Sequence, residues 1–292
     1  MLTHHAAGGG WPARVVVVGA RGFIGAALLR RLERSAANVL ALTSRDIDLT
    51  RPGADEALAA VLKQDDSLVF LSALTPDRGR DAPTMMRNLA MGQHACAALA
   101  RQPVAHAIYV SSDAVYSSAD SLISEDTPPS PQDLYAAMHL ARELMFRAAV
   151  KAPLAILRPA AIYGSGDTHN GYGPNRFCRL ALAGKEIALF GEGEEKRDHV
   201  FIDDAIEIIG LCLRHRSSGL LNLATGQSES FRDVAHAVVA AVGRTVQIKG
   251  TPRVNPVAHR HFDATATIRA FPDFHYRTLA EGLAHTRFVA AA

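Results

Sequence analysis

Short apolar runs alternate with longer amphipathic stretches along the chain from residue 14 onward. Runs rich in Val, Leu, Ile and Ala predict buried strands at residues 15–18, 39–42, 68–71, 107–110 and 154–157. Between them, apolar positions recur at helical spacing, which predicts helices at 25–32, 54–62 and 85–100. Strands that alternate with helices favour an α/β fold with a parallel, doubly wound sheet and helices on both of its faces.

The pattern divides the chain into three parts. Residues 1–13 contain Gly8, Gly9 and Gly10 after two histidines, and we expect a flexible leader outside the fold. Residues 14–163 carry the regular alternation of strands and helices. After residue 164 a stretch rich in Gly, Pro and Asn leads to short mixed elements, so we expect a smaller C-terminal lobe with some segments returning to the first domain.

Composition excludes several classes of protein. Hydrophobic residues make up 48% and charged residues 21%, which is typical of a folded globular chain. The formal net charge is only +2 and there is no basic run, so we expect no nucleic-acid partner. No signal-peptide pattern and no apolar run of roughly 18 residues is present, so we expect no membrane association and a cytoplasmic protein. The three cysteines lack metal-ligand spacing and are predicted to be buried thiols, and we predict no metal site.

A glycine-rich turn directly follows the first predicted strand. Gly19, Gly22 and Gly25 lack a Cβ atom, so the backbone can approach a pyrophosphate at the start of the next helix. An ordinary strand-to-helix turn can also carry three glycines, but the strand before and the helix after favour a dinucleotide site. The cofactor-binding residues predicted in this turn are Gly19, Arg21, Gly22, Phe23, Ile24 and Gly25.

The second predicted strand bears on which dinucleotide binds. A carboxylate that usually closes this strand in NAD sites is absent, because the chain continues Thr43-Ser44-Arg45. Arg21 and Arg45 together suit a ribose 2′-phosphate, so NADP(H) is favoured, while NAD(H) stays open. Further cofactor contacts are predicted at Ser44, Asp48 and Leu49, and the family resemblance described below implies others at Leu71, Ser72, Ala73, Pro159 and Ile162.

The segment 109–116, YVSSDAVY, is followed by Glu125-Asp126-Thr127-Pro128 and then by Tyr135 with His139. With the later stretches RPAAIYG at 158–164, GPNRF at 173–177 and NLATG at 222–226, it resembles the extended short-chain dehydrogenase/reductase group. These are nucleotide-sugar epimerases, dehydratases and reductases of the NAD-dependent epimerase/dehydratase family. The resemblance covers nearly the whole chain after residue 13 and implies a Rossmann domain at 14–163 and a substrate-binding lobe at 164–292.

The resemblance implies three catalytic residues. Tyr135 would exchange the proton of the substrate hydroxyl while hydride moves to or from the nicotinamide. Ser112 would hydrogen-bond the same oxygen. The family has a lysine one helical turn beyond the tyrosine, where this chain has His139, which shares the helix face of Tyr135.

The histidine changes the electrostatics of that site. A lysine ammonium lowers the pKa of the neighbouring phenol, whereas an ordinary histidine is mostly neutral at pH 7. Three readings follow: His139 is held protonated by a neighbour, it orients the ribose while water relays protons, or ordinary activity is lost. A packing role for His139 is the remaining alternative.

The substrate is expected to be a nucleotide-activated sugar that reacts at C4 through a 4-keto species. Family dehydratases carry an acidic pair after the catalytic hydroxyl, but Ala114 follows Asp113, so dehydration is disfavoured. Epimerase and reductase both stay open. By the resemblance, the predicted substrate-binding residues are Thr75, Asn88, Ser112, Asp113, Asn175, Arg176 and Arg197.

The same residues are compatible with two alternative functions. Without the lysine, the protein could be a dinucleotide-binding regulator that turns over little. The same catalytic fold could also act on a ketone that is not attached to a nucleotide. Relatives with this pattern pair through the helices that carry Asn88 and Tyr135, so a homodimer is expected.

Overall fold

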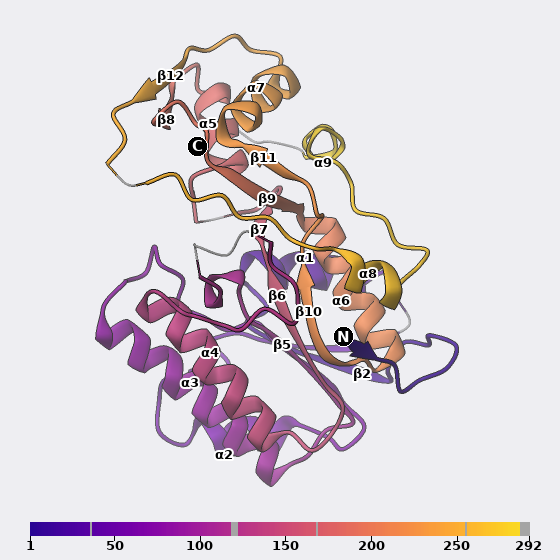
Figure 1. Cartoon of the computed structure of the whole chain (residues 1–292). Helices are drawn as coiled ribbons and strands as arrows, with labels where there is room; N and C mark the ends of the chain where they lie inside the picture. Colours follow the sequence, from indigo (N-terminus) through magenta and orange to yellow (C-terminus); the bar gives the residue numbers. More distant parts are fainter. Residues whose placement is uncertain (36, 118–121, 168, 255, 287–292) are drawn as a thin grey trace.

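The computed structural model describes all residues except 36, 118–121, 168, 255 and 287–292. Its centre is a seven-stranded sheet in the order β1-β10-β6-β5-β4-β2-β3 (Figure 1). All neighbouring strands run parallel except β1, which is antiparallel to β10. The strands are β1 (Leu2–Thr3), β2 (Arg14–Val18), β3 (Asn38–Leu42), β4 (Ser67–Phe70), β5 (His106–Val110), β6 (Leu154–Pro159) and β10 (Ser218–Leu223).

Helices cover both faces of this sheet. They are α1 (Phe23–Leu32), α2 (Ala54–Val61), α3 (Ala82–Arg101), α4 (Leu134–Ala149) and α6 (Ile202–His215). Alternate residues of β2 point to opposite faces, so Val15 and Val17 pack in one apolar cluster with α1 and α6. Val16 and Val18 pack in the other cluster with α2, α3 and α4, which Figure 1 shows together on one side. The predicted doubly wound α/β fold is therefore confirmed.

A second group of elements follows β6. It contains β7 (Ala161–Tyr163), α5 (Pro174–Leu182), β8 (Ile187–Phe190), β9 (Lys196–Phe201), β11 (Ser228–Ser230), α7 (Phe231–Val242), β12 (Ile248–Thr251), α8 (Thr265–Ala270) and α9 (Leu279–His285). Strands β11, β9 and β7 form one small sheet, and β12 pairs with β8 in another. Most of these elements lie beyond the carboxyl ends of the large sheet's strands, whereas β10 returns to the large sheet (Figure 1).

The first residues of the chain take part in the fold. Leu2 and Thr3 pair with Gly219 and Ser218, and the backbone N–H groups of His5 and Ala6 both donate to the carbonyl of His215. This placement differs from the expected leader outside the fold. The physical reason is that β10 would otherwise be an edge strand with unpaired backbone groups, which β1 satisfies.

Two further observations concern the expected class of protein. Cys96, Cys178 and Cys212 are all free and buried, which confirms the prediction of buried thiols. Among the described residues, no helix has the length and apolar character that crossing a membrane requires.

Candidate functional site

The glycine turn brings the first strand, the first helix and the loop after β4 into close contact. A Cβ atom on Gly19 would lie 2.8 Å from the backbone nitrogen of Ser72, and one on Gly25 would collide with the carbonyl oxygen of Gly19. A Cβ on Gly22 would meet only that same oxygen, at 3.3 Å. No side chain caps the start of α1 at Gly22. The turn therefore fits a pyrophosphate, because its helix N–H groups are left for an anion.

A cavity of about 390 Å³ opens at the carboxyl ends of the central strands. It brings together residues that lie as much as 180 positions apart, from Gly19 in the glycine turn to His199 on β9. Fifteen of the predicted site residues line it: Gly19, Gly22, Phe23, Ile24, Gly25, Leu71, Ala73, Thr75, Ser112, Asp113, Tyr135, His139, Pro159, Ile162 and Asn175.

A smaller cavity of about 140 Å³ lies beyond the end of β3. Ser44, Asp48, Leu49 and Ser72, all predicted cofactor contacts, line it. Its apolar side chains come from β2, β3, α2, α3 and the loops after β3 and β4, so it can hold a flat ring such as an adenine. The two cavities lie on either side of the turn after β2, where the strand order of a doubly wound sheet reverses.

Tyr135 occupies the first turn of α4, where the Asp133 side chain caps the helix by accepting from the backbone N–H of Ala136. Burial raises the pKa of the Tyr135 phenol, and the neighbouring Tyr109 and Asp113 raise it further. A hydrogen bond with the Ser112 side chain acts in the opposite direction. Ser112 follows β5, its hydroxyl accepts from the backbone N–H of Ala114, and both predicted catalytic residues, Ser112 and Tyr135, line the same cavity.

His139 lies one turn further along the same face of α4. Its ring centroid is 4.6 Å from that of Tyr135, and only 2% of the residue is exposed. Burial lowers the pKa of His139 well below its usual value, and the positive charge of Arg142 lowers it further. The surroundings therefore favour a neutral imidazole, which speaks against the reading in which a neighbour holds His139 protonated.

Only some of the predicted substrate-binding residues lie at the cavity. Asn88 is buried on α3 and hydrogen-bonds both backbone groups of Leu74, at 2.8 and 3.0 Å. It therefore anchors the backbone beside Thr75. The side-chain oxygen of Asn175 accepts from the backbone N–H of Gly164. Arg176 is exposed, and like Arg21, Arg45 and Arg197 it is absent from the lining of both cavities.

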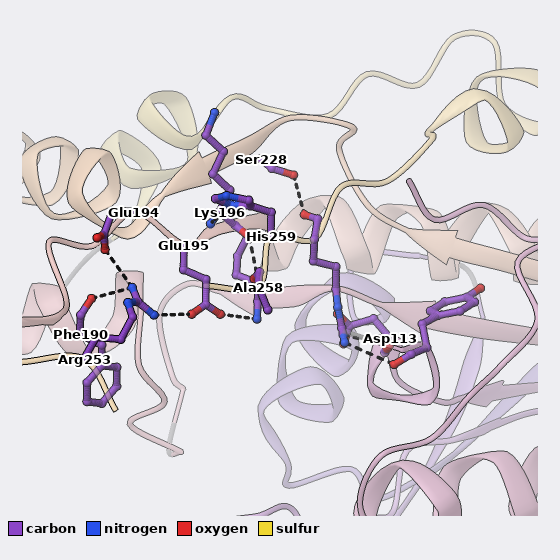
Figure 2. Close-up of polar contacts among 12 residues, drawn as sticks. Asp113, Phe190, Glu194, Glu195, Lys196, Ser228, Arg253, Ala258 and His259 are labelled. Carbon is purple, nitrogen blue, oxygen red and sulfur yellow. Dashed lines mark hydrogen bonds and ion pairs between the residues drawn. The ribbon is translucent and has the colours of Figure 1, made fainter. Parts of the chain in front are cut away.

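Arg197 lies on β9 in a cluster of ion pairs that Figure 2 shows in close-up. Its guanidinium pairs with Glu195, which also pairs with Arg253, and it donates to the carbonyls of Lys196 and Ala258. In the same view Asp113, beside Ser112, accepts a charged hydrogen bond of 2.9 Å, and the donor is Arg260. Ionic contacts thus already engage both of these predicted substrate residues.

Three residues next to the site were not found from the sequence. Tyr109 and Arg142 are buried beneath His139, and Arg260 reaches Asp113 from the segment after β12. Arg142 carries a findable signal, because positions 135, 139 and 142 share one helix face. Arg260 carries none, since 147 residues separate it from the carboxylate that it contacts.

The parallel sheet, the glycine turn and the two cavities at its switch point define a nucleotide-binding α/β protein. The model of the NAD dependent epimerase/dehydratase family matches residues 15–224, and the chain belongs to this family. The resemblance inferred from the motifs at 109–116, 135 and 158–164 is confirmed at the level of the family.

The curated relatives include two 4-epimerases. The dTDP-L-rhamnose 4-epimerase of Burkholderia thailandensis is 34% identical over 154 residues, which are 50% of this chain and 42% of that protein. The UDP-glucose 4-epimerase of Mycolicibacterium smegmatis is 31% identical over 170 residues, which are 56% of this chain and 54% of that protein. The chain thus matches about half the length of each.

Solved structures match over more of the chain. MoeE5 in complex with UDP-glucose and NAD is 27% identical and superposes with a TM-score of 0.80. The match covers 93% of this chain and 96% of that one. The family model ends at residue 224. The structural match therefore extends into the elements of the second group that follow this residue.

Proposed function

We propose that this protein is an epimerase that inverts C4 of a nucleotide-activated sugar through a transient 4-keto sugar. The observation that carries the proposal is the convergence of Ser112, Tyr135 and the glycine turn on one cavity. The names of the two curated relatives, both 4-epimerases, support the position of the reaction. A bound nicotinamide would accept hydride from C4 and return it to the opposite face.

In this proposal Tyr135 takes the proton of the 4-hydroxyl and returns it, while Ser112 holds the same oxygen. Both residues line the cavity, and the Ser112 side chain lowers the pKa of the Tyr135 phenol. His139 faces the same cavity and would contact the nicotinamide ribose. Asp113, Thr75 and Asn175 also line the cavity and would contact the sugar, with Asn88 holding the backbone at Leu74.

For the cofactor we propose NADP(H) over NAD(H). The turn after β3 has Thr43 where NAD sites usually carry a carboxylate, and Arg45 in that turn and Arg21 in the glycine turn are both exposed. The nearby Asp46 carboxylate is engaged with Thr43, by 2.9 Å to its N–H and 2.7 Å to its hydroxyl. A 2′-phosphate would therefore meet two guanidinium groups. Because MoeE5 is solved with NAD, this preference needs a direct comparison of affinities.

For the substrate nucleotide we propose contacts from Arg197 and Arg176. Arg197 has 24% of its side chain exposed and faces Glu195, so a pyrophosphate would compete with that carboxylate for the guanidinium. Net reduction of a 4-keto sugar is a second candidate. The observation in its favour is the pair of arginines, because they suit the 2′-phosphate of NADPH, the hydride donor that a net reduction would consume.

The test is a product assay of the purified protein with UDP-, dTDP- and GDP-sugars, with NAD or NADP added separately. We expect a C4 epimer without net change in dinucleotide absorbance, and a loss of at least about 100-fold in kcat for Tyr135→Phe. Net consumption of NADPH with a 4-keto sugar would establish the reductase instead. Dinucleotide binding without turnover of any sugar would reject both.

A further inference from the structure

Three polar side chains lie buried directly beneath the proposed catalytic tyrosine. They are Tyr109 of β5 and His139 and Arg142 of α4, with exposed fractions of 1%, 2% and 0%. The Tyr109 hydroxyl lies 2.8 Å from Nδ1 of His139, and the two rings stack. The Arg142 guanidinium lies 5.3 Å from the Tyr109 ring centroid. Tyr109 and Arg142 form a second layer behind the cavity wall, to which His139 itself belongs.

The other ring nitrogen of His139 has no protein partner. Nε2 is buried, and no described residue hydrogen-bonds it, although His139 lines the 390 Å³ cavity. A buried polar atom left without a hydrogen bond costs about 1–3 kcal/mol. Nε2 therefore has the properties of a group that a bound ligand satisfies.

The direction of the Tyr109–His139 hydrogen bond decides what Nε2 can do. A phenol is a stronger acid than a neutral imidazole, and an imidazole nitrogen is a stronger base than a phenol oxygen, so O–H···N is the favoured sense. With Nδ1 accepting, the hydrogen of the neutral ring is on Nε2. Arg142, which pairs with no carboxylate among the described residues, opposes a second proton on the ring.

We infer that Tyr109 is a positioning residue: by donating to Nδ1 it holds His139 as a neutral Nε2–H donor for a ribose hydroxyl of the bound dinucleotide. A lysine at this position can only donate hydrogen bonds to a ligand. Of the two neutral tautomers, only the one with hydrogen on Nε2 lets His139 donate to the ligand in the same way. The inference rests on the proposed function for its ligand. It assigns a role to Tyr109 that the motif around Tyr135 does not contain.

The first test is nitrogen-15 NMR of the free protein labelled at histidine, with His139→Gln identifying the His139 signals. We expect the hydrogen of His139 on Nε2 in the wild type, and a mixture of tautomers in Tyr109→Phe. A hydrogen on Nδ1, or a doubly protonated ring at pH 7, would overturn the inference. This measurement needs neither cofactor nor turnover.

The second test is a double-mutant cycle on NADPH affinity, measured by calorimetry. We expect Tyr109→Phe to weaken binding about fivefold to tenfold in the wild-type background and to have no effect in His139→Gln. Tyr116→Phe is the matched control, because the buried hydroxyl of Tyr116 hydrogen-bonds Asn222 and Arg158 and not His139. This variant should bind NADPH with wild-type affinity. An equal loss from Tyr109→Phe in both backgrounds would mean a merely structural role.

The outcomes separate this inference from the proposed function. Turnover of a nucleotide sugar, together with unchanged NADPH affinity in Tyr109→Phe, rejects the inference alone. The Nε2–H tautomer and Tyr109-dependent NADPH binding, without turnover of any sugar, reject the proposed epimerase alone. If Tyr109→Phe does not fold, the wild-type spectrum still decides the tautomer.

Discussion

At the scale of single residues, the ionisation of Tyr135 should govern the rate. Burial first, and then Tyr109 and Asp113, raise the pKa of this phenol, while Arg142 and Ser112 lower it. Because the reactive form is the deprotonated one, we expect kcat/KM to rise steadily between about pH 7 and pH 9. His139→Lys should add a cation beside the phenol and raise the rate at pH 7, by about tenfold for each unit by which the pKa falls.

His139→Gln provides the comparison for that experiment, because it keeps a donor without adding charge. Its pH profile should have the shape of the wild-type profile. A wild-type rate that is flat across this range would show that Tyr135 does not limit turnover. A folded His139→Lys variant with lower activity at every pH would show that the site depends on the histidine itself.

A second residue with a measurable effect is His106, at the start of β5. Its Nε2 bonds the carbonyl of Ser217 at 2.9 Å, and burial lowers the pKa of His106 to about 4. In the unfolded chain His106 therefore takes up a proton near pH 6.5, whereas in the folded chain it does so only near pH 4. The contribution of His106 to the free energy of unfolding is fully present above pH 6.5. It is lost as the pH falls, by roughly 3 kcal/mol between pH 6.5 and pH 4.

Urea unfolding from pH 4 to pH 8 measures this loss. His106→Gln can still donate to Ser217 and should lose correspondingly less stability in acid. The same substitution at the exposed His236 is the control and should follow the wild type. If His106→Gln and the wild type lose stability equally, the proton responsible binds elsewhere.

At the scale of elements, the contact of β2 with α1 depends on Gly25. A methyl group there would collide with the backbone oxygen of Gly19, which cannot move without displacing the phosphate turn. We expect Gly25→Ala to destabilise the protein by roughly 1–3 kcal/mol and to weaken dinucleotide binding more than tenfold. Thermal unfolding and calorimetry measure the two effects.

Gly10→Ala is the matched control for that substitution. No atom lies within 4 Å of the added methyl group, so both stability and binding should be unchanged. A Gly25→Ala variant that binds dinucleotide with wild-type affinity would contradict a pyrophosphate at this turn.

At the scale of the whole molecule, the neighbouring helices α3 and α4 each expose a large apolar side chain to solvent. Met86 is 61% exposed and Leu144 is 58% exposed, whereas Met138 on the same helix as Leu144 is fully buried. We expect a homodimer through these helices, with twice the chain mass of 31.2 kDa in light scattering. Leu144→Glu should give the monomer mass.

Val254→Glu serves as the control for the dimer, because this 94% exposed residue lies outside both helices. It should leave the dimer intact. A wild-type protein that elutes at the monomer mass at all concentrations would reject the predicted interface.

Much of the fold follows from local pattern. The five predicted strands coincide with β2 to β6 within one or two residues at either end, and the three predicted helices with α1, α2 and α3 within three residues. Apolar runs and helical spacing are local properties, so they survive in the sequence alone. The glycine turn and the order of Ser112, Tyr135 and His139 are local in the same sense, and the cavity collects all of them.

Contacts between distant segments were decided only by the tertiary structure. The pairing of β1 with β10, the ion pair of Arg260 with Asp113 and the bond of Tyr109 to His139 join residues that no short-range pattern relates. Each of these contacts depends on which strand edge is left unpaired or on which side chains the fold buries next to one another. The sequence by itself therefore determined the five strands and three helices named above, the family and the chemical groups, whereas three-dimensional packing decided the charge and the hydrogen-bond partners of those groups.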